Sequence, residues 1–259
     1  MNVPGKVAIV TGSGGGGTGR ATARRFAREG AAVVVNDVNE AGGRETVALI
    51  EAAGGRAAFC PADVKVEADI QGLIAFAEST FGGLDVLVNK ASSPDGMGLL
   101  TGWTDAVRIE VLGPMHATLA AIEAMRRSGG GAIVNIGSTS ALGHGRKHSP
   151  WPAYDVGKIA QIRLTTTLAC LHQKENIRVN CLVPSWVASP GPKEYWESLT
   201  PEQRKERGVP DTLISLDEIS DAILRLATDE TLFGRIMVWW NGQPPQLIPI
   251  GDPGYQTLD

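Results

Sequence analysis

Residues 6–26 read KVAIVTGSGGGGTGRATARRF, and this stretch decides the fold of the chain. Its first six residues form a short apolar, β-branched run, and the glycines from Gly12 to Gly19 separate that run from an amphipathic segment. Glycines between a strand and a helix let the backbone approach a pyrophosphate, and the helix N-terminus then supplies amide donors and a favourable dipole. The stretch therefore predicts a strand, a phosphate-binding turn and a helix, in that order.

The rest of the chain repeats this alternation of short apolar runs and longer amphipathic segments. Seven runs are expected to form strands: 6–11, 31–36, 57–62, 84–89, 131–137, 177–183 and 235–240. Several of them are apolar throughout, as strands covered on both faces are. The pattern predicts an α/β fold, a Rossmann-type doubly wound parallel sheet of about seven strands with helices on both faces. We expect residues 1–259 to form a single dinucleotide-binding domain, with the Pro- and charge-rich segment 184–215 as a flap over the substrate.

Composition narrows the class of protein. The net charge of −4 does not suggest a nucleic-acid or anionic-membrane surface, so neither is expected as a partner. No apolar run approaches the ~20 residues that cross a bilayer, and the N-terminus lacks the pattern of a secretory leader. The three cysteines, Cys60, Cys170 and Cys181, are scattered and fit a reducing compartment. We therefore expect a cytoplasmic protein.

An acidic residue at the end of the second strand indicates which dinucleotide binds. Asp37 follows Gly19 by 18 residues, near the ~20-residue offset at which a carboxylate accepts hydrogen bonds from the adenosine ribose. The same carboxylate would repel the extra phosphate of NADP, so NAD(H) is the expected cofactor. A flexible glycine linker is the alternative for the loop. A nucleoside-triphosphate loop would need Lys followed by Ser or Thr where Arg20 and Ala21 stand.

Together, six landmarks resemble the short-chain dehydrogenase/reductase family over nearly the whole chain. They are TGSGGGGTG (11–19), ADV (62–64), LVNKA (87–91), IVNIGS (133–138), YDVGK (154–158) and IRVNCLVPSWV (177–187). The resemblance implies that the dinucleotide lies between the glycine loop, the ends of the strands and the segment from Pro184 to Ser189. The cofactor-binding residues expected on this basis are Gly12, Ser13, Gly17, Thr18, Gly19, Asp37, Val38, Asp63, Val64, Asn89, Ala91, Tyr154, Lys158, Pro184, Val187 and Ser189.

The same resemblance implies that Ser138, Tyr154 and Lys158 are the catalytic serine, tyrosine and lysine. On a helix, the four-residue offset places Tyr154 and Lys158 on one face. A phenol has a reference pKa of about 10, and a unit charge ~4 Å away at a dielectric of ~20 is worth about 4 kcal/mol. We therefore expect Lys158 to lower the pKa of Tyr154, which would then act as acid and base. Ser138 would donate a hydrogen bond to the reacting carbonyl oxygen.

Several positions depart from the family pattern. The glycine loop is one residue longer than usual, Lys90 and Ser92 replace an asparagine and a glycine, and Ser185 replaces a glycine. Glu110 occupies the position of the catalytic asparagine. A buried carboxylate there is expected either to leave a backbone role intact or to pair with Lys158 and weaken its effect on Tyr154.

An insert before Tyr154 and several aromatic residues point to the substrate. The segment 139–153, between Ser138 and Tyr154, is about three residues longer than in most family members. His144 and His148 are four residues apart, but Gly145 and Pro150 indicate a loop there, so no metal site is expected. Trp151, Trp186, Tyr195 and Trp196 are expected to border a pocket for a bulky or aromatic substrate.

The function expected from these residues is an NAD(H)-dependent oxidoreductase that interconverts a secondary alcohol and a ketone. A non-catalytic dinucleotide-binding or regulatory protein on the same scaffold is the alternative. The resemblance also implies a homotetramer or dimer built from long helices around 101–127 and 152–173.

Overall fold

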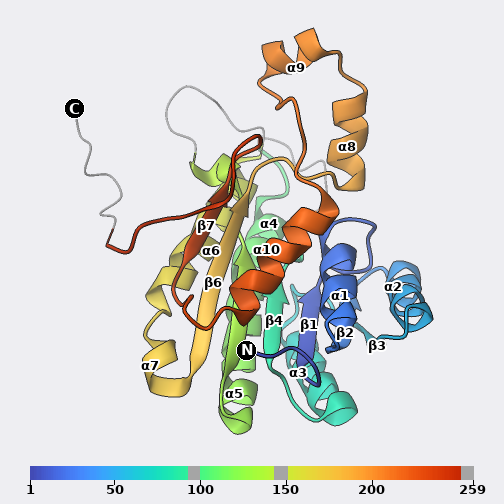
Figure 1. The fold of residues 1–259 in the computed structure, drawn as a ribbon, viewed down its shortest axis with the longest axis vertical. Coiled ribbons are helices and arrows are strands. Elements are labelled where there is room, and N and C mark those ends of the chain that lie inside the picture. Colours follow the sequence, from blue (N-terminus) through green and yellow to red (C-terminus); the bar gives the residue numbers. More distant parts are fainter. Residues whose placement is uncertain (93–99, 143–150, 252–259) are drawn as a thin grey trace.

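The structure is a computed structural model that describes residues 1–92, 100–142 and 151–251 (Figure 1). The strands are β1 (Val7–Thr11), β2 (Ala32–Asp37), β3 (Arg56–Pro61), β4 (Val86–Asn89), β5 (Gly131–Ile136), β6 (Ile177–Pro184), β7 (Ile236–Trp239) and β8 (Gln246–Leu247). The helices are α1 (Thr18–Arg28), α2 (Glu40–Ala52), α3 (Glu67–Phe81), α4 (Trp103–Val107), α5 (Gly113–Ser128), α6 (Pro152–Thr167), α7 (Leu171–Glu175), α8 (Pro190–Glu197), α9 (Pro201–Arg207) and α10 (Leu216–Thr228). A π-helical turn, η1 (Arg108–Leu112), joins α4 to α5, and a 3₁₀ turn, η2 (Thr139–Leu142), follows β5.

The strands form one sheet in the order β3-β2-β1-β4-β5-β6-β7-β8. The pairs from β3 to β7 are parallel, and β8 pairs with β7 in the antiparallel direction. Each of the seven predicted strands is present within one or two residues, and the doubly wound α/β fold is confirmed. The short β8 was not predicted because its two residues carry no periodic pattern.

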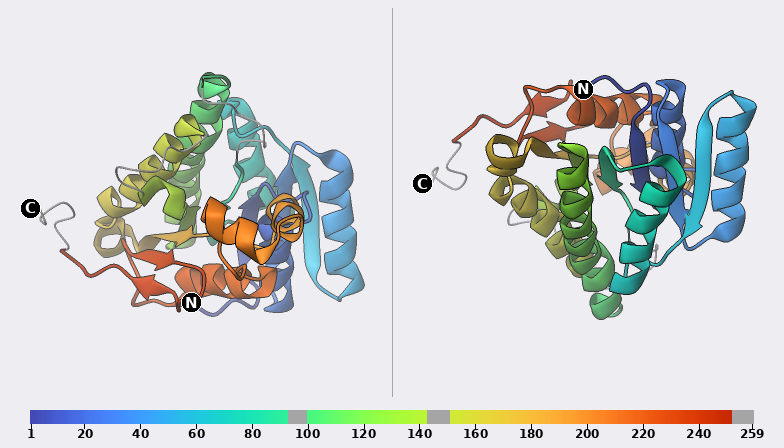
Figure 2. Two further views of the ribbon diagram at one scale, coloured as in Figure 1. Left: turned by 90° about the horizontal axis from the view of Figure 1, so that it is seen from above. Right: turned by 90° about the horizontal axis from the view of Figure 1, so that it is seen from below.

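Helices cover both faces of the sheet (Figure 2). One buried layer joins the sheet to α1 and α10 through residues such as Phe26, Ile219 and Ile223. The other joins it to α3 and α5 through residues such as Leu73, Ile74 and Met125. Strands buried on both faces explain why their sequences are continuously apolar.

The order of the strands reverses at β1, which pairs with β2 on one side and with β4 on the other. In open α/β sheets, ligands bind outside the carboxyl ends of the strands at such a switch point. Because parallel strands share a direction, the loops that follow β1, β2, β4, β5 and β6 meet at one edge of the sheet. That edge carries the candidate site.

The segment predicted as a flap follows β6 and contains α8 and α9, which project beyond the carboxyl edge of the sheet (Figure 1). A bridge between Val187 and Ile214 and the hydrogen bond from the Ala188 N–H to the Ile214 carbonyl close its base. The two long helices expected from the sequence differ in detail. The first is broken by η1 into α4 and α5, and the second ends at Thr167, before the short α7.

Candidate active site

The glycine loop between β1 and α1 fits tightly against neighbouring backbone. Gly12 has φ +65°, and a Cβ built on it would lie 2.7 Å from the Ala91 Cα. A Cβ on Gly19 would lie 2.1 Å from the Gly12 carbonyl oxygen. No side chain fits at either position, so both glycines are required for the loop to close over the start of α1.

The outer part of this loop suits a pyrophosphate. No heavy atom outside the adjoining residues lies within 4 Å of a Cβ built on Gly15, so the backbone there is open to a ligand. Gly17 precedes α1 and has no side chain with which to cap the first amides of the helix. Amide donors and the positive end of the helix dipole are therefore directed toward this space. Ser189 faces the loop from the other side, where its Oγ lies 3.5 Å from the Thr18 Oγ1.

The Asp37 carboxylate lies at the end of β2, against the same loop. It accepts hydrogen bonds from the Gly14 N–H at 2.7 Å and from the Asn39 N–H at 2.9 Å. The nearby Arg20 is occupied by protein partners, since it donates to the Thr46 hydroxyl at 2.9 Å and to Glu45 at 2.6 Å. The Asp37 carboxylate therefore leaves a negative charge beside the glycine loop, because the charge of Arg20 is paired with Glu45.

The loop after β4 is attached to β1 by a side chain that sequence reasoning did not assign to the site. The Thr11 hydroxyl accepts hydrogen bonds from the Lys90 and Ala91 N–H groups, both at 3.0 Å. Asn89 is buried and donates to the Asn135 side chain at 2.9 Å, so β4 and β5 are linked through their polar ends. Only the order of the strands reveals that Thr11 faces this loop.

The remaining residues expected to contact the dinucleotide lie along the same edge. Val38 is 68% exposed after β2, and the Asp63 N–H after β3 is held by the Asp69 carboxylate at 2.9 Å. The Val64 carbonyl lies against the first turn of α5, where it would be 2.8 Å from a Cβ on Gly113. The structure thus brings the expected positions to one edge, listed in chain order as Gly12, Ser13, Gly17, Thr18, Gly19, Asp37, Val38, Asp63, Val64, Asn89, Ala91, Pro184, Val187 and Ser189.

Ser138 and Tyr154 meet beyond the end of β5. Tyr154 lies in the first turn of α6, is half-buried, and shares a hydrogen bond with Ser138. The Ser138 Oγ lies 2.9 Å from the Ser140 Oγ and accepts the Ser140 N–H at 3.2 Å. The Lys158 ammonium lies 5.3 Å from the centre of the Tyr154 ring, as the helical spacing predicted. The three side chains therefore converge.

Lys158 lowers the pKa of the Tyr154 phenol, as expected, but the expected net decrease is wrong for this structure. Burial raises the pKa of the phenol most, and the Glu110 carboxylate also raises it, so that together they outweigh Lys158 and the Ser138 hydrogen bond, which lower it. The net pKa is above the ordinary value of a tyrosine. Spacing along a helix predicts the neighbouring charge but not the burial that opposes it.

Glu110 explains part of this difference, because it pairs directly with Lys158. Its Oε2 lies 2.8 Å from the Lys158 Nζ, and the exposed fractions of the two side chains are 0% and 2%. Lys158 also donates to the Ile136 carbonyl at 2.9 Å. Burial alone would lower the pKa of Lys158, but the charges of Glu110 and Tyr154 and the hydrogen bond with Glu110 together raise it. Of the two outcomes expected for Glu110, the structure contains the direct ion pair.

Among the described residues, Ser92 and Gln161 also hold Glu110, and neither was assigned a role from the sequence. The Ser92 hydroxyl donates to Glu110 Oε1 at 2.6 Å. The Gln161 amide donates to the Glu110 carbonyl at 3.1 Å and to Oε2 at 3.3 Å. Ser92 was noted as a departure from the family pattern, but its partner is 18 residues away, and the sequence does not show that the two meet.

The nearby Cys181 does not add a nucleophile to the site. It is fully buried on β6, and burial raises the pKa of its thiol to about 12. A thiol in this state is largely unreactive at neutral pH.

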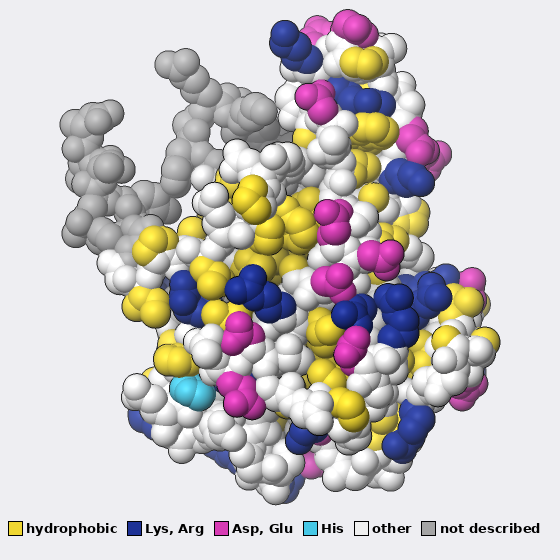
Figure 3. All heavy atoms as spheres, in the orientation of Figure 1, with side chains coloured by type: hydrophobic (Ala, Val, Ile, Leu, Met, Phe, Trp, Pro, Cys, Tyr) yellow, Lys and Arg dark blue, Asp and Glu magenta, His cyan; other side chains and the backbone are white. Residues whose placement is uncertain are grey.

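The aromatic residues of the projecting segment divide into two groups. Trp186 and Tyr195 stack on each other with ring centres 6.0 Å apart. Trp196 instead packs within the segment, where its Nε1 donates to the Pro210 carbonyl at 2.8 Å and Arg204 lies over its ring. The insert residues His144 and His148 lie outside the described residues. Hydrophobic side chains gather on the surface beneath the projection (Figure 3).

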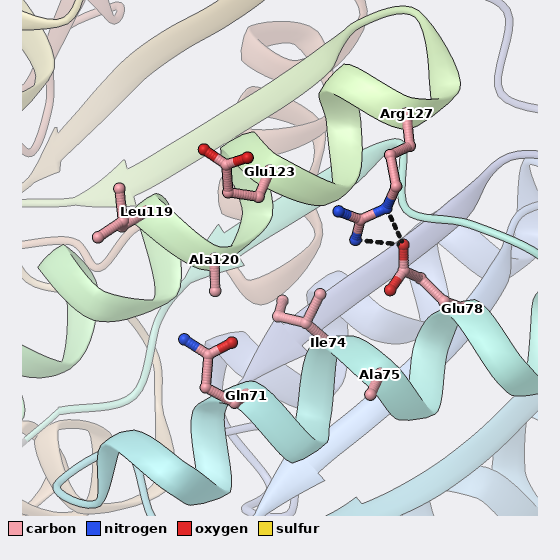
Figure 4. A pocket seen from close by; sticks show the side chains of 8 residues that line it. All are labelled: Gln71, Ile74, Ala75, Glu78, Leu119, Ala120, Glu123 and Arg127. Atoms are coloured by element: carbon pink, nitrogen blue, oxygen red, sulfur yellow. Dashed lines mark hydrogen bonds and ion pairs between the residues drawn. The ribbon is translucent and has the colours of Figure 1, made fainter.

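A separate hollow lies on the surface between α3 and α5 (Figure 4). It has a volume of about 380 Å³, and the ion pair between Glu78 and Arg127 closes one end of it at 2.6 Å. It contains none of the expected site residues, so it plays no part in the candidate chemistry. Among the described residues, no helix is both long and apolar enough to cross a membrane.

Comparison with known proteins identifies the family of the chain and agrees with its fold. Residues 6–199 match the family model described as short chain dehydrogenase. The chain is 37% identical over 248 residues to an uncharacterized oxidoreductase of Thermotoga maritima, covering 90% of this chain and 94% of the relative. It is 33% identical to 3beta-hydroxysteroid dehydrogenase 1 of Eggerthella lenta, covering 90% of each chain. A solved structure of 7α-hydroxysteroid dehydrogenase with NADH and 7-oxo glycochenodeoxycholic acid superposes with a TM-score of 0.82 at 28% identity, covering 95% of this chain and 98% of that one.

Proposed function

Because this chain belongs to the short-chain dehydrogenase/reductase family of oxidoreductases, which bind nicotinamide dinucleotides, we propose that it is an NAD(H)-dependent enzyme interconverting a secondary alcohol and a ketone. The observation that carries the proposal is the convergence of Ser138, Tyr154 and Lys158 beyond the end of β5. The reaction class rests on the family, and the cofactor and residue roles rest on the site.

Each part of the site has a role in this proposal. The α1 N-terminus and the open backbone at Gly15 would hold the pyrophosphate, and Asp37 would accept hydrogen bonds from the adenosine ribose. When bound, the nicotinamide supplies or accepts the hydride. Tyr154 moves the proton to or from the substrate oxygen, and Ser138 donates a hydrogen bond to that oxygen. Lys158 holds positive charge beside the phenol.

The partners of Arg20, which follows the glycine loop, favour NAD(H) over NADP(H). Arg20, the basic side chain closest in sequence after the loop, is held by Thr46, Glu45 and the Gly14 carbonyl. The Asp37 carboxylate would repel an added phosphate on the ribose. We therefore assign NAD(H) as the cofactor.

The surroundings of the site suit a bulky or aromatic substrate. The Trp186–Tyr195 stack lies in the segment that follows β6, and Trp151 is 46% exposed at the start of α6. The steroid-acting dehydrogenases to which the chain is similar support a substrate of that size. We propose that residues 184–215 cover it as a flap on a single dinucleotide-binding domain, in a homo-oligomeric protein.

The test is the oxidation of NADH in the presence of bulky ketones, polycyclic and aromatic, with Tyr154→Phe beside the unmodified protein. We expect turnover that falls by at least 100-fold in the variant, because general acid–base catalysis contributes about 10²–10⁴-fold. Dinucleotide binding, followed by the fluorescence of the tryptophans, should stay within twofold. Full activity in Tyr154→Phe would end the assignment of Tyr154 as proton donor.

A second function has one observation in its favour. The closed Glu110–Lys158 pair ties up the ammonium that would otherwise activate the phenol. A dinucleotide-binding or regulatory protein without catalysis would tolerate that arrangement. Tight NADH binding without turnover of any ketone or alcohol would favour this alternative.

A further inference from the structure

The two oxygens of the Glu110 carboxylate have different partners, and together these hold the side chain in one orientation. Oε2 faces the Lys158 ammonium at 2.8 Å, and Oε1 accepts the Ser92 hydroxyl at 2.6 Å. Gln161 reaches from α6 to the Glu110 carbonyl and to Oε2. The carboxylate is fully buried, and it sits in a π-helical turn, which is frequently found at functional sites. The contacts with Lys158, Ser92 and Gln161 therefore fix the position of the Glu110 charge relative to the ammonium.

The groups around the phenol decide what this orientation does. Tyr154 faces Lys158 and Asp155 from its own helix, Glu110 from η1 and Ser138 from the end of β5, and Lys158 in turn faces Cys181 on β6. Lys158 is the cation among these described groups. A carboxylate 2.8 Å from its ammonium offsets much of the field that would otherwise stabilise a phenolate. Geometry and charge both favour the protonated phenol.

We propose that Glu110, oriented by Ser92 and Gln161, is a positioning residue that closes Lys158 into an ion pair and thereby keeps Tyr154 protonated, as the proton donor to a carbonyl, to a higher pH than Lys158 alone would allow. The inference deepens the proposed function and rests on it, because it concerns the proton that Tyr154 gives to the ketone. In the reductive step the carbonyl carbon gains a hydride from the reduced dinucleotide, which is oxidised. The carbonyl oxygen gains the phenol proton, and the Tyr154 phenolate then regains a proton from water.

The first experiment titrates the phenol without any turnover. Tyrosine ionisation is followed by ultraviolet absorbance in the dinucleotide-free protein, and the same titration of Tyr154→Phe is subtracted to isolate Tyr154. We expect the Tyr154 midpoint in the unmodified protein to lie above the ~10 of a free tyrosine. A midpoint below 9 overturns the inference. This test needs only the Tyr154→Phe variant.

The second experiment removes the carboxylate charge with Glu110→Gln and Glu110→Asn, each with its own Tyr154→Phe subtraction. We expect the first proton of the coupled Tyr154–Lys158 pair to be lost at least one pH unit lower, whichever of the two groups releases it. Glu123→Gln, on the exposed side of α5, removes an equal charge far from Lys158 and should leave the midpoint unchanged. Glu110→Asp keeps the charge and should restore most of the original midpoint. At least one of Glu110→Gln and Glu110→Asn is needed in folded form. If the midpoint of the folded variant is unchanged, the inference is overturned.

The kinetic counterpart separates this inference from the proposed function. Glu110→Gln should move the alkaline fall in the rate of ketone reduction, and the rise of alcohol oxidation with pH, at least one pH unit lower. If no carbonyl or alcohol is turned over at all, the proposed function fails, although the titration still reports the effect of Glu110 on the phenol. If turnover occurs and neither the midpoint nor the pH profile responds to Glu110, the inference fails and the proposed function stands.

Discussion

Gly157 faces Glu110 so closely that a Cβ built on Gly157 would lie 2.2 Å from the Glu110 Cβ. This contact is where α6 crosses η1, one residue before Lys158. The absence of a side chain at Gly157 therefore sets the distance between the helix that carries Tyr154 and Lys158 and the turn that carries Glu110. The glycine of YDVGK is required by packing rather than by backbone conformation.

Gly157→Ala should push α6 away from η1 and lengthen the ion pair between Lys158 and Glu110. Overpacking of a buried contact costs about 1–3 kcal/mol of unfolding free energy, which outweighs the better helix propensity of alanine. Urea unfolding and the rate of ketone reduction measure the two consequences, and we expect activity to fall at least tenfold. Gly72→Ala is the matched control, because a Cβ there meets no atom within 4 Å. That variant should gain about 0.5–1 kcal/mol and keep full activity.

Asp37→Ser tests the preference for NAD(H). The serine can still contact the Gly14 N–H, but it no longer presents a negative charge to the ribose. We expect the ratio of NADH to NADPH affinity to fall at least tenfold, or about 1.4 kcal/mol. Fluorescence titration with both dinucleotides measures the ratio. Glu51→Gln removes an equal charge at the far end of α2 and should leave it unaltered, whereas an unaltered ratio in Asp37→Ser would contradict the cofactor assignment.

Removing the N-cap of one helix in the body and of one helix in the projecting segment should have different effects on stability and on substrate binding. Ser215 caps α10 by accepting the Glu218 N–H at 3.2 Å, and Thr200 caps α9 by accepting the Gln203 N–H at 3.3 Å. Ser215→Ala should lower the unfolding free energy by about 1 kcal/mol, because α10 packs on α1 and the sheet. Thr200→Ala should leave global unfolding nearly unchanged and raise KM for the ketone, because α9 lies in the proposed flap. Equal losses of stability in the two variants would indicate that the segment unfolds together with the body.

Much of the fold could be predicted because its signals are local. Continuous apolar runs such as those at Val33–Val35 and Ile133–Val134 are buried on both faces of the sheet, and the glycines after β1 mark the turn before α1. The residues that follow these strands in the sequence predict a site at the carboxyl edge. The π-helical turn at Glu110 was not predicted, because it depends on how α6 packs against it and not on the residues of the turn itself.

The residues of the candidate site could be predicted from the sequence, but the effect of their charges on one another could not. Spacing along one helix places Tyr154 beside Lys158, yet the sign of the Tyr154 pKa change depends on burial and on Glu110. The Ser92–Glu110 hydrogen bond joins a loop after β4 to η1, and no local pattern indicates that contact. Long-range contacts of this kind become visible only when the strand order is known.

Stability at alkaline pH should report the state of the Tyr154–Lys158 pair. Both groups have a folded-state pKa raised above the unfolded value, so the folded protein binds more protons than the unfolded chain above about pH 10. The stability from these groups is fully present below that pH and is lost as pH rises through the folded pKa values. Because one pKa unit corresponds to about 1.4 kcal/mol, we expect the unfolding free energy to fall by about 1–2 kcal/mol between pH 9.5 and pH 11. Urea unfolding across this range measures the slope, which should be shallower in Tyr154→Phe because one of the two raised groups is removed. A slope of zero, or a steeper slope in the variant, would contradict the direction of both pKa changes.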